Sequence, residues 1–164
     1  MPRSRLGPVL FLGLASLACS ASPDFDPVQV EREAQTFMNA YGEDLTNHDV
    51  DAIAGRYDRR GAYRMGHGRK TLSPFEEIQS QYRDSWQGPA AFEWHDLSYE
   101  VLSADAVMVA GRFSWTMVDT LPPLSMSYSG LLLRQDGALR IRLEDESMDM
   151  SQVGMFLEQM GVGN

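Results

Sequence analysis

Between residues 26 and 87, apolar side chains recur every three or four positions, which is the spacing of one helical face. A first helix is predicted to begin at Asp26-Pro27, an N-cap residue followed by a proline suited to the first helical position. A shorter second helix is expected over residues 50–57, ending before Gly61. The stripe of the first helix consists of Val30, Ala34, Phe37, Met38, Tyr41 and Leu45.

The alternating segment 62–66 predicts a short strand, which Gly66 and Gly68 should end. Ser73-Pro74-Phe75-Glu76 then has the form of a capping box with proline at the first helical position. It predicts a third helix that ends at Gly88-Pro89. The apolar face of this helix would carry Phe75, Ile78, Tyr82 and Trp86.

After residue 91 the apolar period changes to two, which is typical of strands. Four strands are predicted, at 92–102, 106–119, 124–134 and 139–147, with a hairpin turn at Gln135-Asp136-Gly137. Helices followed by a run of strands indicate the α+β class, with three N-terminal helices packed on one face of a mainly antiparallel sheet. Segment 153–160 has the pattern of a short terminal helix.

The chain length of 164 residues fits one folded domain preceded by an export signal. Two arginines precede an apolar run at 9–18 that is too short to span a bilayer. We divide the chain into a signal peptide (1–18), a tether (19–27), a domain (28–149) and a tail (150–164). The boundaries follow the composition alone.

Cys19 is the single cysteine, so no disulfide within the chain can form. Its place after small residues resembles the lipidated cysteine of bacterial lipoprotein signals. This resemblance implies a cell-envelope protein, periplasmic and anchored to the membrane through Cys19. Ordinary cleavage near Ala18 or Ala21 is the alternative, and it would give a secreted protein.

Acidic residues outnumber basic ones by 23 to 14, for a net charge of −9. Nucleic-acid binding needs a basic face, so we expect no nucleic-acid partner. Electrostatic docking on anionic lipid is disfavoured for the same reason, which leaves the N-terminal lipid anchor as the expected membrane contact. The basic stretch from Arg56 to Lys70 could receive an anion, but such runs more often balance nearby acids.

Four segments, in this order and spacing, resemble the nuclear transport factor 2-like, or SnoaL-like, superfamily: RYDRRGAYRMG (56–66), SPFEEIQSQY (73–82), LSADAVMVAGRF (102–113) and QDGALRI (135–141). The resemblance covers about residues 28–149. It implies a curved sheet wrapped on three helices, forming a cone with an apolar pocket open at one end. Members of that superfamily include ketosteroid isomerases, dehydratases, polyketide cyclases and non-enzymatic modules, so the fold leaves the function open.

The candidate pocket residues come from the helix stripes and from strand parity. An aromatic and methionine-rich wall suits a flat apolar ligand, although each of these side chains could equally fill the core. The candidate ligand-binding residues are Phe37, Tyr57, Tyr63, Met65, Tyr82, Trp86, Phe113 and Trp115.

The last strand carries a candidate acid. Asp145 shares its parity with Leu139, Ile141 and Leu143, so it is predicted to point inward, where burial would raise its pKa and suit acid–base catalysis. Tyr41 could then donate a hydrogen bond to an oxyanion. The alternative is that Asp145 ends its strand in water or pairs with an arginine. Glu144 and Glu146 have the opposite parity and are expected on the solvated outer face.

The resemblance also places the usual catalytic groups. The general base of isomerase-like members aligns with Met65, and an inward histidine pair aligns with Leu143 and Asp145, so the usual groups are replaced. None of the three histidines has a partner at metal-ligand spacing, and we predict no metal site and no cofactor. His67, in a glycine-flanked loop, is a secondary catalytic candidate.

The function predicted from the sequence is binding of a small apolar or aromatic molecule. The second hypothesis is an enzyme of the lyase or isomerase class that uses Asp145 and a pocket tyrosine. The third is an interaction module that forms homodimers through the outer face of its sheet.

Overall fold

The computed structural model describes residues 25–66 and 69–148. The predicted signal peptide, Cys19, His67 and the expected terminal helix at 153–160 lie outside them. The elements are α1 (Pro27–Asn47), α2 (Val50–Gly55), β1 (Ala62–Gly66), β2 (Arg69–Ser73), α3 (Phe75–Asp84), β3 (Ala91–Ser103), β4 (Ala106–Thr116), β5 (Leu124–Gln135) and β6 (Ala138–Met148).

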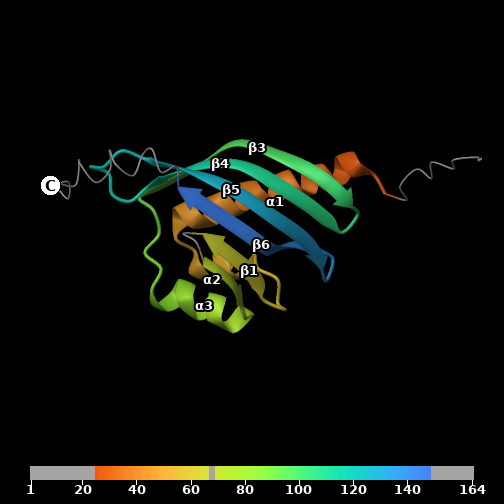
Figure 1. The fold of residues 1–164 in the computed structure, drawn as a ribbon, viewed down its shortest axis with the longest axis horizontal. Helices are drawn as coiled ribbons and strands as arrows, with labels where there is room; N and C mark the ends of the chain where they lie inside the picture. The colour runs from red at the N-terminus through yellow and green to blue at the C-terminus, as the bar shows by residue number, and fades with distance from the viewer. Residues whose placement is uncertain (1–24, 67–68, 149–164) are drawn as a thin grey trace, which may run out of the picture.

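The fold is α+β, as predicted, with the described strands in one six-stranded sheet of order β2-β1-β6-β5-β4-β3. The pairing is antiparallel except between β1 and β6, which run parallel. Figure 1 shows α1 along one face of the long strands, with α2 and α3 near β1. The core lies between the helices and the concave face of the sheet. No helix of the described residues is long and apolar enough to cross a membrane.

The first helix begins as predicted, whereas the third does not. The Asp26 carboxylate accepts a hydrogen bond from the backbone N–H of Val28 at 3.0 Å, and Pro27 is the first helical residue. At α3 no side chain caps the helix, and Pro74 takes the N-cap position. Ser73 is the last residue of β2 and pairs with Ala62, so it is not placed as a helix cap. The expected capping box is therefore wrong.

The edge strand β2 was not predicted. It pairs antiparallel with β1, from Ala62↔Ser73 to Gly66↔Arg69. Leu72 on this strand is 49% exposed. An edge strand needs less regular alternation of apolar and polar residues, because it buries little of its surface, and its sequence RKTLS shows no clear period of two.

A β-bulge in β6 changes which side chains enter the core. Leu131 pairs with Leu143 while the next residue, Leu132, pairs with Ile141, so Arg142 is an extra residue on β6. The buried positions are consequently Ile141 and Glu144, three residues apart rather than two. Because a one-residue shift exchanges the two faces of a strand, the prediction of an inward Asp145 is wrong. Glu144 and Glu146 occupy the concave face instead.

Gly61 connects α2 to β1 with a positive φ of 91°, and a Cβ there would lie 2.5 Å from the Ser73 carbonyl oxygen. We expect Gly61→Ala to destabilise the protein by roughly 1–3 kcal/mol, because the obstacle is backbone and cannot move aside. Gly55→Ala is the matched control, since a Cβ there meets nothing within 4 Å. Thermal unfolding should show a lower Tm for the first variant and an equal or higher Tm for the second. Equal losses would contradict this account.

Candidate functional site

An apolar pocket of about 240 Å³ opens at the end of the sheet where β4 and β6 finish and β5 begins. Its walls are aromatic and methionine side chains from these three strands and from the loop after β4. A single carboxyl group, that of Glu146, joins them among the described residues. The lining residues are Phe113, Trp115, Met117, Leu124, Met126, Glu146 and Met148.

Glu146 is chemically unusual because its carboxyl group is held among apolar side chains. Burial, and then the nearby negative charge of Glu144, raise the pKa of Glu146 from the ordinary 4.5 to about 8. At neutral pH this carboxyl group therefore carries a proton for most of the time. It can donate a hydrogen bond or give up a proton inside an apolar pocket.

Deeper in the cone, three tyrosines converge on Glu144. The Tyr57 hydroxyl donates to Glu144 Oε1 at 2.6 Å. It lies 3.1 Å from the Tyr41 hydroxyl and 2.8 Å from the Tyr82 hydroxyl. Since a phenol has one proton, Tyr57 must accept from both Tyr41 and Tyr82. Residues of α1 and α3, the segment after α2, and β6 thus meet at one carboxylate.

Arg64 supplies the positive charge of this cluster. It lies on β1 with Nε 3.4 Å from Glu144 Oε1, and its guanidinium stands over the Tyr57 and Tyr82 rings at 6.0 and 5.8 Å. Burial raises the pKa of Glu144, and the charge of Arg64 acts against that rise. Burial also raises the pKa of Tyr41 and of Tyr57 well above 10, so both act as hydrogen-bond donors and not as bases.

Of the residues singled out by sequence, Phe113 and Trp115 line the pocket, and Trp86 packs edge-on against Trp115 at 6.3 Å. Tyr41, Tyr57 and Tyr82 come together, but in the buried cluster. Four predicted site residues are not brought to either place. Tyr63 is 38% exposed, with the Arg142 guanidinium over its ring, and Met65 lies two residues further along β1. Phe37 packs under the Arg56 guanidinium. Asp145 accepts a hydrogen bond from the Ser147 hydroxyl on the opposite face of β6.

Sequence analysis missed Arg64, Glu144 and Glu146. The aromatic and apolar residues of the first strand favour Tyr63 and Met65 as its inward positions, and the sequence offers Arg64 only as one member of a basic stretch. The two glutamates were placed outside because strict alternation was carried through the β6 bulge. Three acids in the run Glu144-Asp145-Glu146 at the end of an apolar strand were the available signal, but the run does not say which of them faces inward.

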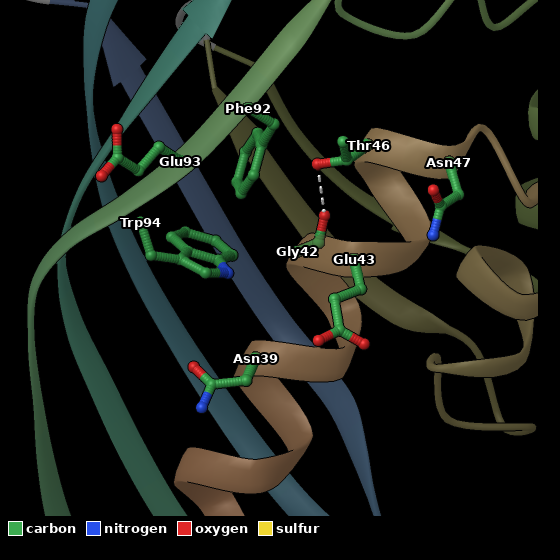
Figure 2. Close-up of a pocket in the computed structure, with 8 residues that line it drawn as sticks. All are labelled: Asn39, Gly42, Glu43, Thr46, Asn47, Phe92, Glu93 and Trp94. Carbon is green, nitrogen blue, oxygen red and sulfur yellow. Dashed lines mark hydrogen bonds between the residues drawn. The ribbon is translucent and has the colours of Figure 1, made fainter.

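A second, larger hollow of about 480 Å³ lies between α1 and β3. Figure 2 shows Phe92 and Trp94 directed toward the helix, with Glu93 directed away from it. Two of the polar groups here have partners within the chain: the Trp94 indole donates to the Met38 carbonyl at 3.0 Å, and the Thr46 hydroxyl donates to the Gly42 carbonyl at 2.9 Å.

Metal binding finds no support within the described residues. They contain no group of three or more histidine, cysteine, aspartate or glutamate side chains that could hold an ion. The two inward glutamates face tyrosines, an arginine and apolar side chains.

No protein-family model and no curated protein sequence matches the chain. Solved structures do match the chain. An NTF-2-like protein of unknown function from Shewanella oneidensis superposes with a TM-score of 0.63 at 15% identity, covering 71% of this chain and 98% of that one. A cystatin-like fold protein from Burkholderia xenovorans gives 0.61 at 16%, covering 73% and 92%. A type 2 hexachlorocyclohexane dehydrochlorinase gives 0.60 at 16%, covering 74% and 86%.

These similarities establish the fold. The chain has the NTF-2-like, or cystatin-like, α+β cone that its sequence motifs resemble. At this level of identity the neighbours do not carry their functions over to this chain, and they include both an enzyme and proteins of unknown function.

The raised pKa of Glu146 predicts how stability depends on pH. Between pH 4.5 and about 8 the folded state keeps a proton that the unfolded state has released, so raising the pH favours unfolding. The contribution of this group to stability is complete below pH 4.5 and is lost as the pH rises through 8. We expect the free energy of unfolding to fall by up to about 1.4 kcal/mol per pH unit for this group.

Urea unfolding at several pH values would measure this slope. Glu146→Gln should flatten it, because the neutral amide has no proton to lose. Glu93→Gln is the control, since Glu93 is exposed on β3. A slope unchanged by Glu146→Gln would show that the carboxyl group is solvated.

Proposed function

We propose that this protein binds a small apolar or aromatic molecule in the pocket at the open end of the cone. The observation that carries the proposal is the wall of that pocket, in which aromatic and methionine side chains surround one carboxyl group. A cavity of ~150 Å³ accommodates benzene, so about 240 Å³ has room for a somewhat larger molecule of roughly two rings.

The wall supports a flat ligand in particular. Trp115 and Phe113 present aromatic surface from β4, while Met126 and Met148 face them from paired positions on β5 and β6. Methionine adapts to irregular shapes and contacts aromatic rings favourably through its sulfur. Glu146, when protonated, gives such a ligand one polar contact without a buried charge.

We propose further that the protein acts outside the cytoplasm, on the strength of the arginine-initiated apolar run at 9–18, with Cys19 as its lipid anchor. Homodimer formation through the outer face of the sheet stays a prediction.

Placing a charge in the wall tests the binding proposal. Met148→Asp should weaken binding of 2-methylnaphthalene at least about tenfold, because the ligand would have to desolvate a carboxylate. The matched control is Met108→Asp, which makes the same change on β4 at a side chain 43% exposed. Equilibrium dialysis measures both affinities. The proposal fails if the wild type does not bind, or if the two variants weaken binding equally.

Proton transfer is a second candidate function, favoured by the pKa of about 8 at Glu146 in an apolar pocket. In this reaction the Glu146 carboxylate would take a proton from the carbon next to a ligand carbonyl, leaving an enolate, and the carboxylic acid would then return the proton. This differs from the enzyme hypothesis drawn from the sequence, because the acid is Glu146 and not Asp145.

Deuterium exchange tests this reaction. With 2-tetralone in D₂O, NMR should show faster deuterium incorporation next to the carbonyl than buffer alone, rising with pH through 8. Glu146→Gln should reduce the protein-dependent rate by about 100-fold, and Glu93→Gln should leave it unchanged. Exchange no faster than in buffer would leave binding as the function.

A further inference from the structure

The pocket at the open end of the cone contains a carboxyl group without a partner in the protein. Glu146 lies on the innermost rung of the lining: Met126 pairs with Met148 nearer the strand ends, and Tyr128 pairs with Glu146 one rung further in. Within the described residues, no hydrogen bond or ion pair reaches the Glu146 carboxyl group, and the charges that influence it act from a distance.

Glu146 differs from the other unpaired polar groups of the cone because a molecule in the pocket can touch it. Arg64 Nε, the Tyr128 hydroxyl and Glu144 Oε2 are buried without partners, and none of these residues lines the pocket. Glu146 does line the pocket. A bound molecule can therefore supply the partner that the protein does not provide for this group.

The ionisable groups around Glu146 leave it short of positive charge. Glu144 and Asp145 on β6 oppose a negative charge at Glu146, whereas Arg64 on β1 favours one. Arg64 lies 3.4 Å from Glu144, so its charge is balanced mainly by that carboxylate. The phenols that face the same region are neutral, because burial raises their pKa values; they are Tyr41 of α1, Tyr82 of α3 and Tyr128 of β5.

The rest of the wall suits a positively charged group. Trp115 and Phe113 contribute aromatic rings, and the π face of such a ring attracts a cation. The part of the lining formed by described residues contains no arginine, lysine or histidine, so nothing in it repels a cation. The carboxyl group is already removed from water by folding, so pairing requires the desolvation of the ligand alone.

We propose that the pocket selects small organic ammonium ions with an aromatic body, whose ring lies against Trp115 and Met148 and whose ammonium group pairs with the Glu146 carboxylate. This inference rests on the proposed ligand-binding function and names the ligand class of the same pocket. It assigns Glu146 as the residue that determines specificity. A neutral molecule of the same shape leaves the carboxyl group protonated and forms no ion pair.

The test compares three ligands of nearly equal size by equilibrium dialysis against the purified protein: 2-naphthylmethylamine, 2-naphthalenemethanol and 2-ethylnaphthalene. At about pH 8 the wild type should bind the amine about tenfold more tightly than the alcohol, because a charge-assisted hydrogen bond is roughly twice as strong as a neutral one. The alcohol thus separates the ion pair from an ordinary hydrogen bond.

The amine should also bind more tightly as the pH rises. The pKa of Glu146 in the free protein is about 8, so pairing with an ammonium ion below that pH releases the proton of the carboxyl group. A primary alkylammonium keeps its own proton over this range. The affinity for the amine should therefore increase by up to about tenfold per pH unit from about pH 6 to about pH 8, while the affinity for 2-ethylnaphthalene changes little.

Glu146→Gln should abolish both the preference for the amine and its pH dependence, because the amide cannot ionise. Its affinity for 2-ethylnaphthalene should stay within about twofold of the wild type, which also shows that the variant is folded. Glu93→Gln is the matched control, since it makes the same change in net charge at an exposed residue of β3. It should keep the preference and the pH dependence.

The outcomes separate the two proposals. Equal affinities for the amine and the alcohol overturn the ammonium specificity, as does an amine affinity that does not rise with pH or a preference that survives Glu146→Gln. In these cases binding of 2-ethylnaphthalene would still support the proposed function. Failure of all three ligands to bind overturns the proposed function together with the specificity that rests on it.

Discussion

The arrangement of this cone depends on one buried carboxylate. Glu144 is 4% exposed, and a charge in that position needs partners because an isolated ionised group in the interior is very unfavourable. The partners come from separate parts of the chain: Tyr57 donates to it and is itself bound by Tyr41 and Tyr82, while Arg64 balances its charge. The cluster therefore fixes the positions of α1, α3 and β1 relative to β6.

This constraint also decides where chemistry can take place. Tyr57 donates its one hydroxyl proton to Glu144, so this phenol cannot also donate a hydrogen bond to a ligand. Two residues along β6, Glu146 has apolar neighbours at the pocket and no ion pair among the described residues. Two glutamates on one strand face thus differ in role because one has a cation beside it and the other does not.

The helices and most strands could be predicted because their apolar periods are long and regular, and the α+β class follows from their order. Which β6 side chains face inward could not be predicted. The extra residue Arg142 is apparent only from the pairing of β6 with β5, and the local sequence pattern does not indicate it. The inward position of Arg64 could not be predicted for a related reason. Its burial makes sense only beside Glu144, which lies far along the chain and meets it through the parallel pairing of β1 with β6.

The same reasoning shows how the function of such a cone is to be argued. Structures that share this fold include a dehydrochlorinase and proteins of unknown function, so the shape of the cone does not choose between binding and catalysis. The choice depends on which polar atoms are already satisfied by the protein. Here the phenol of Tyr57 is satisfied, whereas the Tyr128 hydroxyl and Glu144 Oε2 are not. Those two atoms are buried and do not line the pocket, whose one carboxyl group among the described residues is that of Glu146. Glu146 is therefore the charged or polar group through which the pocket can contact a bound molecule.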